Sequence, residues 1–295
     1  MKQNRFISLV LCVAFICAPS SAQFKGQNFA EKPISANLNV ESTDFSSNIF
    51  EGFTNLICPW DLSLVALGGL SYYKPNEEGT TSTLEPLAVD LQISGSVARN
   101  DGRESLGSRL HPGKIQTNIF IGQLAITSLL DIATDAHITA SDYERSFVFA
   151  KALLYTVSIT EISKNLLPRI RPDGSNNRSF FSGHVSSSFT TSAFIYREIS
   201  DWIDGMESSS HTSSTLLKGT AFAACYGWAT YVGYSRIRDR KHYLSDVLVG
   251  AAVGTVIGNF IYDLHFDNED QSTTSVLQFS FNPAVRPSVG LTYHF

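Results

Sequence analysis

A succession of helix-length apolar segments most constrains how this chain can fold. Each segment mixes apolar and small residues over a length typical of a helix, and prolines or Ser/Thr-rich stretches separate the segments. The segments cover residues 118–133, 144–167, 184–203, 215–236 and 243–264. They predict a mainly α protein whose core, residues 117–265, is a helical bundle.

The same segments are poor candidates for membrane spans. The longest uncharged runs, residues 219–235 and 247–262, are diluted with small residues and fall short of the roughly 20 apolar residues that a span requires. Earlier segments carry Asp131, Lys151 and Glu161, and charges are costly in lipid. We expect a bundle that buries its apolar surface in its own core. Membrane contact stays open, because small residues also pack membrane helices.

The composition is that of a protein with a sizeable core. Hydrophobic residues make up 43% of the chain and charged residues 17%, and the formal net charge is −5. Disordered chains combine few apolar residues with high net charge, and nucleic-acid-binding proteins usually carry a basic excess. Both classes are therefore excluded, and no nucleic acid is expected as a partner.

The first residues have the three-part layout of a secretory signal peptide. Lys2 and Arg5 precede an uncharged apolar run, residues 6–18, and small residues follow up to Ala22. Because the run is too short to span a bilayer, we expect residues 1–22 to be a cleaved signal peptide, with an uncleaved anchor as the alternative. The mature protein is then exported to the periplasm of a bacterial cell envelope.

Residues 23–116 are expected to form a long, irregular N-terminal extension with one helix near residues 60–72. The mature chain keeps two cysteines, Cys58 and Cys225. Export permits a disulfide between them, and a buried free thiol at Cys225 is the alternative.

The last residues, 266–295, form a tail. Within it, VLQFSF and VGLTYHF alternate apolar and polar residues on either side of a turn at 282–287, which predicts a short β-hairpin laid on the body of the protein. The terminal aromatic residue, Phe295, resembles the end of a bacterial outer-membrane barrel, but two strands cannot close a barrel.

The candidate chemistry lies in three islands of polar residues at the ends of the apolar segments. In the third island, SRIRDRKHYLSD, His242 and Asp246 have the spacing that places two residues on one helix face. We expect the carboxylate to accept a proton from one imidazole nitrogen and to leave the other as a nucleophile. Arg236 offers a planar fork for phosphate oxygens. Alone, the pattern also fits a helix-end histidine with a surface partner.

The other two islands add groups that bind anions. In FFSGHVSSS, Ser182, Gly183 and His184 begin a predicted helix, where a hydroxyl and free backbone N–H groups favour an anion. Ser182 as a simple N-cap is the alternative. In KNLLPRIRP, Lys164 and Arg171 lie about two turns apart. They can converge on one anion or merely complement the dipole of a helix end.

In chain order the islands give K-x6-R-P, S-G-H and S-R-x5-H-x3-D. This order resembles the motifs of the type 2 phosphatidic acid phosphatase and haloperoxidase superfamily, which includes bacterial class A acid phosphatases and lipid phosphatases. The resemblance covers residues 145–264. One departure is Phe181, which stands where the family usually has a proline and therefore bears on loop shape and substrate fit.

The resemblance implies a metal-independent phosphatase without a cofactor, acting on phosphomonoesters or diphosphates through a phosphohistidine. It implies that His242 attacks phosphorus with support from Asp246, and that His184 protonates the leaving oxygen and then activates water. The phosphate-binding groups implied in the same way are Lys164, Arg171, Ser182, Gly183 and Arg236.

The substrate class stays open between lipid phosphates at a membrane-facing site and soluble phosphomonoesters. Two other functions remain as alternatives. One is a vanadium-dependent haloperoxidase, because the same residues can hold vanadate. The other is a non-catalytic outer-membrane or scaffold protein that retains the helical core.

Overall fold

The structure is a computed structural model that describes most of the chain from residue 45 onwards. The described residues are 45–54, 56–57, 59–73, 82–99, 101–110, 112–133, 138–206, 211–266, 277–282 and 288–293. The predicted signal peptide, residues 1–22, and Cys58 lie outside them. Cys225 is a half-buried free thiol.

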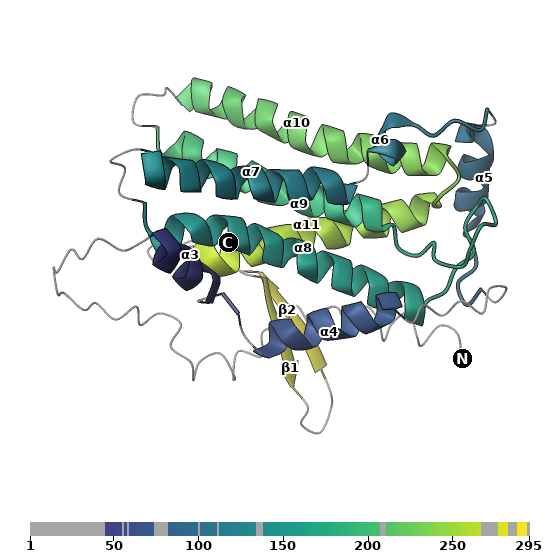
Figure 1. Cartoon of the computed structure of the whole chain (residues 1–295). Helices are drawn as coiled ribbons and strands as arrows, with labels where there is room; N and C mark the ends of the chain where they lie inside the picture. Colours follow the sequence, from purple (N-terminus) through teal and green to yellow (C-terminus); the bar gives the residue numbers. More distant parts are fainter. Residues whose placement is uncertain are drawn as a thin grey trace.

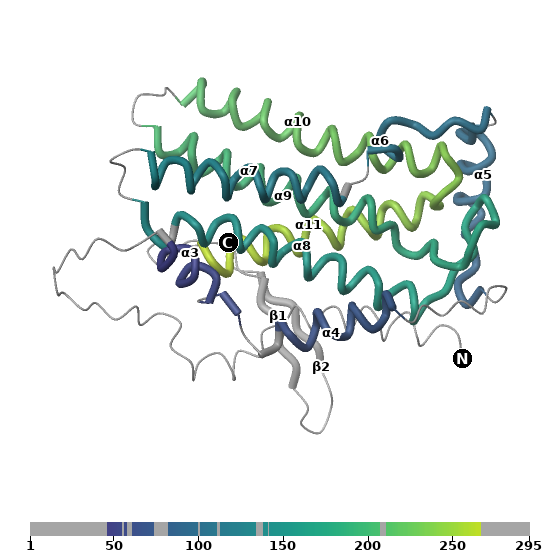
Figure 2. The backbone as a smooth tube through the Cα atoms, viewed as in Figure 1, coloured from purple at the N-terminus to yellow at the C-terminus, as the bar shows by residue number. Residues whose placement is uncertain are grey.

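Long helices that run side by side form the body of the structure (Figure 1). Figure 2 shows the same helices as a backbone tube, which makes their alternating directions easier to follow. They are α7 (Pro112–Ala133), α8 (Ala140–Leu166), α9 (Gly183–Asp204), α10 (His211–Arg238) and α11 (Leu244–Phe266). These helices overlap the predicted segments, and the mainly α fold predicted from the sequence is confirmed.

Local sequence explains both ends of α8. Asp142 Oδ2 accepts hydrogen bonds from the Thr139 N–H (2.8 Å) and the Thr139 hydroxyl (3.0 Å), which caps the helix start. The helix ends at Leu166 because Pro168 has no N–H to continue it and disfavours the helical conformation of the residue before it.

The N-terminal extension is more helical than the sequence predicted. The helix expected near residues 60–72 is α4 (Pro59–Tyr73), which packs against α8. Further helices are α3 (Phe45–Thr54), α5 (Ala88–Val97) and α6 (Leu106–Arg109). The short helices α5 and α6 contact α10, and α5 also contacts α11. Tertiary contacts stabilise them without a long amphipathic pattern, so the irregular region expected there is interrupted by helices.

Glycines let α11 approach α9 closely. Gly250, Gly254 and Gly258 share one face of α11, and a Cβ atom at Gly254 would lie only 2.2 Å from the Ser186 carbonyl oxygen. The Thr190 hydroxyl donates to the Gly254 carbonyl at 3.0 Å. Small residues therefore bring the two helix backbones into contact.

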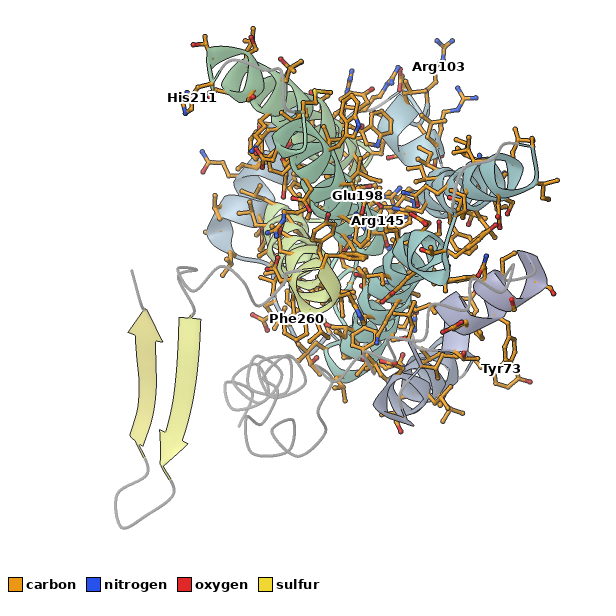
Figure 3. The ribbon with its side chains drawn as sticks, turned by 90° about the vertical axis from the view of Figure 1, so that its left-hand side faces the viewer. Tyr73, Arg103, Arg145, Glu198, His211 and Phe260 are labelled. Carbon is orange, nitrogen blue, oxygen red and sulfur yellow. The ribbon has the colours of Figure 1, made fainter. Side chains whose placement is uncertain are left out.

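The hydrophobic core lies between α8, α9 and α11. The Phe194 ring is central in it, 5.2 Å from the Phe149 ring and 5.1 Å from the Tyr262 ring. Near the end of the bundle that faces the viewer in Figure 3, Arg145 on α8 and Glu198 on α9 point toward each other, with Nη1 and Oε1 2.8 Å apart. Aromatic packing and this ion pair join the three helices.

The apolar surface of α7 is largely exposed, and the Leu129 side chain is 65% exposed. Within the described part of the chain, three helices are long and apolar enough to cross a membrane by length and composition: Gly113–Ala133, Asp142–Leu166 and Leu244–Phe266. Only 6% of the apolar window of the first is buried. This differs from the expected bundle that buries its apolar surface in its own core.

Two of the three charges that counted against membrane spans, Lys151 and Glu161, form ion pairs in the structure. Lys151 Nζ lies 3.1 Å from Asp61 Oδ2 of α4, and Glu161 Oε1 lies 2.6 Å from Lys164 Nζ. Pairing lowers the cost of a charge in a medium of low dielectric constant. The criterion of an uninterrupted apolar run is stricter than the length and composition by which three helices qualify as candidate spans.

Close to the C-terminus, Leu277–Asn282 (β1) pairs antiparallel with Ser288–Tyr293 (β2), with Leu277 opposite Tyr293. The position of this pair as a hairpin on the body of the protein stays a prediction.

Candidate functional site

The three polar islands meet at one end of the bundle. Helices α8 and α10 end there and α9 and α11 begin there, on the right of Figure 1, with α5 beside them. A helix start presents free N–H groups and the positive end of the helix dipole. This end of the bundle therefore favours bound negative charge.

The segment 167–182 between α8 and α9 folds back on itself. The Arg169 N–H donates to the Asn177 carbonyl (2.7 Å), and the Ser179 N–H donates to the Arg169 carbonyl (3.0 Å). The reversal passes through Gly174, whose φ of +72° is a conformation that glycine adopts without strain. This return places the Ser179 main chain beside the third island.

His242 lies between α10 and α11, and its ring is buried. Its Nδ1 is 2.7 Å from the Ser179 carbonyl oxygen. Because a carbonyl only accepts hydrogen bonds, Nδ1 carries the proton and Nε2 keeps the lone pair. The predicted direct hydrogen bond from His242 to Asp246 is corrected, since Nδ1 and Asp246 Oδ2 are 3.8 Å apart. The reason is that α11 begins only at Leu244, so His242 is not on the helix.

The surroundings of His242 favour its neutral form. Burial lowers the pKa of His242 from 6.5 to about 4, and the positive charges of Arg236 and Arg171 lower it as well, while Asp246 raises it. At neutral pH the imidazole is therefore uncharged, with the free lone pair on Nε2 that a nucleophile needs.

Asp246 is fully buried and well satisfied. Its Oδ2 accepts hydrogen bonds from the Ser179 hydroxyl (2.6 Å) and the Tyr243 N–H (2.9 Å), and its Oδ1 accepts one from Arg169. Its backbone carbonyl accepts the Ser182 N–H at 3.2 Å, which ties the start of α11 to the start of α9. Hydrogen bonds of this kind stabilise the charged carboxylate.

Several buried donors at this end have no hydrogen-bond partner among the described residues. They include Ser182 Oγ, Arg171 Nε and Arg236 Nε. Ser182 stands at the N-cap position of α9, but its side chain makes no capping hydrogen bond. Burial lowers the pKa of Arg236 to about 10, and the charge of Arg171 contributes to the shift. Buried donors beside two guanidinium groups are a suitable environment for an anion.

Lys164, in the first island, lies close to Gly183 in the second island. Its Nζ lies 3.3 Å from the point where a Cβ atom at Gly183 would be, so the missing side chain leaves room for the ammonium group. Glu161 binds Lys164 through one carboxylate oxygen (2.6 Å) and Arg178 through the other. His184 follows Gly183 as the second residue of α9 and is half-buried.

The structure therefore brings all the predicted site residues to one end of the bundle. They are Lys164, Arg171, Ser182, Gly183, His184, Arg236, His242 and Asp246. Phe181, in place of the family proline, is buried in the core with its ring centroid 6.0 Å from that of Phe180. Within the described ranges, no group of three or more His, Cys, Asp or Glu residues is placed to hold a metal ion.

The sequence alone did not reveal several residues that hold this site together. Ser179 acts through its main-chain carbonyl and its hydroxyl, and it belongs to none of the three motifs. Arg169 lies inside the island KNLLPRIRP, and its charge at an apolar helix end was the available signal. Asp90 is a lone acid in the apolar stretch LAVDLQI, where an unpaired charge is costly and a buried partner could have been inferred.

Comparisons with known proteins agree with the motifs. A lipid A 1-phosphatase of Porphyromonas gingivalis is 34% identical over 97 residues, which cover 32% of this chain and 18% of that protein. Lipid phosphate phosphatase 1 of Arabidopsis thaliana is 33% identical over 93 residues, which cover 31% of this chain and 27% of that protein. The matches thus span less than a third of the length of either relative.

Among solved structures, the crystal structure of Aquifex aeolicus LpxE is similar with a TM-score of 0.38 and 18% identity, over 61% of this chain and 98% of that chain. The family model of the PAP2 superfamily, the type 2 phosphatidic acid phosphatases, matches residues 145–270. This segment contains all three motifs, and the predicted resemblance is confirmed. Residues 145–270 of this chain are therefore similar to the PAP2 superfamily.

Proposed function

We propose that this protein is a phosphatase that hydrolyses phosphate monoesters of lipids through a phosphohistidine at His242. The observation that carries the proposal is a buried histidine of fixed tautomer at the same end of the bundle as buried donors without partners. The two relatives, a lipid A 1-phosphatase and a lipid phosphate phosphatase, support the same class of reaction.

Substrate binding uses the positive groups at the site. The guanidinium groups of Arg171 and Arg236 and the Lys164 ammonium hold the phosphoryl oxygens, and Ser182 Oγ and the Gly183 N–H add neutral hydrogen bonds. Charge of this kind stabilises the phosphoryl group as it is transferred. Because these side chains supply the positive charge, the proposed reaction does not require a metal ion.

The first step is attack by His242 Nε2 on phosphorus. The P–N bond forms and the bond from phosphorus to the ester oxygen breaks, while His184 donates a proton to the departing oxygen. In the second step His184 accepts a proton from water, the water oxygen attacks phosphorus, and the P–N bond breaks to release phosphate. One histidine is thus nucleophile and the other acid and base.

A lipid substrate is supported by the exposed apolar surface of the bundle. The exposed apolar side chains of α7 and the membrane-span character of three helices suit a protein in contact with lipid. We propose membrane association, with export directed by residues 1–22, the family core at residues 117–265, and the extension and tail on either side of it.

A kinetic comparison of two histidine variants tests the proposal. His242→Ala should lower kcat on a water-soluble phosphomonoester and on a lipid phosphate by at least about a thousandfold, because it removes the nucleophile. His211→Ala is the matched control, since His211 is exposed at the start of α10, and it should retain wild-type activity.

The assays are run on salt-washed membranes and on soluble extract, with a chelator present. Wild-type hydrolysis by His242→Ala contradicts the mechanism, and activity lost with the chelator contradicts metal independence. Activity on the soluble ester alone contradicts the lipid substrate. Halide oxidation after vanadate loading supports the haloperoxidase alternative instead, and no turnover of any ester supports the non-catalytic one.

A further inference from the structure

Helix α5 contributes one fully buried carboxylate to the end of the bundle that holds the site. This helix lies outside the segment that matches the family model, residues 145–270, and it contacts α10 and α11 at the right of Figure 1. Its Asp90 side chain is 0% exposed. A carboxylate is rarely buried so completely unless its charge is compensated.

The Asp90 carboxylate accepts hydrogen bonds from three residues, Leu87, Ser245 and Arg169. Its Oδ2 accepts from the Leu87 N–H (3.0 Å), the Ser245 hydroxyl (2.7 Å) and Arg169 Nη2 (2.7 Å). Its Oδ1 accepts from the Ser245 N–H (2.9 Å). Because Ser245 precedes Asp246 in the first turn of α11, Asp90 fixes the position of that turn from another part of the chain.

Arg169 connects Asp90 to the site. Its side chain is 1% exposed, its Nη2 binds Asp90, and its Nη1 binds Asp246 and donates to the Ser245 hydroxyl at 2.8 Å. Its guanidinium also lies 4.5 Å from the centroid of the Tyr243 ring. Arg169 therefore bridges two buried carboxylates, and only one of them belongs to the family motif.

The net charge of Asp90, Arg169 and Asp246 affects the electrostatic potential at the His242 ring. Two carboxylates and one guanidinium leave a net negative charge, so Asp246 keeps part of its negative potential toward the His242 ring, 3.8 Å away. Without Asp90, the charge of Arg169 would be compensated by Asp246 alone. The potential that supports a positive, phosphorylated imidazole would then fall.

We propose that Asp90 and Arg169 are positioning residues that place and polarise Asp246 for its action on His242. The inference rests on the proposed function, in which His242 is the nucleophile. It adds that the site is incomplete without a residue from the N-terminal extension. Neither residue is among the groups proposed to bind phosphate, so changing either one removes none of those groups.

Kinetics of Asp90→Asn test this role. The variant keeps the shape of the side chain and loses its charge, so kcat should fall about tenfold, as for other outer-shell partners. KM and the inhibition constant of inorganic phosphate should stay within twofold. Asp101→Asn is the matched control, because Asp101 follows α5, is exposed and binds the neighbouring Arg99 side chain and Arg103 N–H. It should leave kcat unchanged.

A double-variant cycle separates positioning from general destabilisation. If Asp90 acts through Arg169, adding Asp90→Asn to Arg169→Gln should lower kcat by less than twofold beyond Arg169→Gln alone. Arg169→Lys, which keeps the charge but cannot bridge both carboxylates with one planar group, should recover part of the loss. Full additivity, or an unchanged kcat in Asp90→Asn, overturns the inference while leaving the phosphatase activity intact.

One measurement does not depend on turnover. The proton on His242 Nδ1 should give a downfield NMR resonance that is absent in His242→Gln, and Asp90→Asn should shift it or speed its exchange with solvent. An unchanged resonance overturns the inference. If the wild-type protein hydrolyses no phosphate ester, the proposed function fails, and this resonance still decides whether Asp90 acts on His242.

Discussion

At the scale of the residue, the neutral form of His242 has a cost that stability measurements can detect. The pKa of His242 is 6.5 in the unfolded chain and about 4 in the folded protein. Between pH 6.5 and pH 4 the unfolded state binds the proton more tightly than the folded state. The free energy of unfolding therefore has its full value above pH 6.5 and decreases as the pH falls toward 4. The full difference is on the order of 3 kcal/mol, from about 1.4 kcal/mol for each unit of pKa.

We therefore expect the Tm of the wild-type protein to fall more steeply than that of His242→Gln between pH 6.5 and pH 4. Glutamine at this position does not titrate, so the variant lacks this contribution. Thermal unfolding in detergent at intervals of half a pH unit measures both curves. Parallel curves would show that burial does not disfavour protonation of His242.

At the scale of the element, the contact between α9 and α11 depends on glycine. Gly254→Ala places a methyl group against the Ser186 carbonyl, at a point only 2.2 Å from its oxygen, so one helix must move. Overpacking of this kind costs about 1–3 kcal/mol. It should also lower activity, because α9 and α11 carry site residues at their starts.

Gly227→Ala on α10 is the matched control. Apart from the adjacent backbone of α10 itself, none of the described residues places an atom within 4 Å of a Cβ at Gly227, so the substitution should raise stability slightly through its better helix propensity. Tm and kcat of the two variants are compared. Equal Tm values would contradict the close approach of α9 and α11.

The sequence predicted the long helices but not the short helices α5 and α6. The long helices α7 to α11 were predicted because apolar length and breakers are local properties of the chain. Helices α5 and α6 were not, because they are short and contacts with α10 and α11 stabilise them. Propensity and periodicity are weak in such short elements, and packing decides.

At the scale of the whole molecule, the proposed membrane association predicts that lipid covers the exposed face of α7. In membranes, a cysteine at Leu129 should not react with a water-soluble maleimide if lipid covers this face. Thr212→Cys, exposed at the start of α10, should react once vesicles are opened. Both variants carry serine at the native Cys58 and Cys225. Equal labelling at the two positions would contradict lipid contact by α7.

The sequence by itself determined the types of element, the three motifs and the chemical classes of the site residues, because helix periodicity, breakers and short spacings act within a few turns. Only the tertiary structure decided which groups complete the site. The Ser179 main-chain carbonyl accepts a hydrogen bond from His242 Nδ1, and Asp90 reaches Ser245 across 155 positions of the chain. Such partners follow from how helices pack, which local sequence does not encode. Tertiary packing also decides that one face of α7 is exposed, because an apolar surface is buried only where other helices cover it.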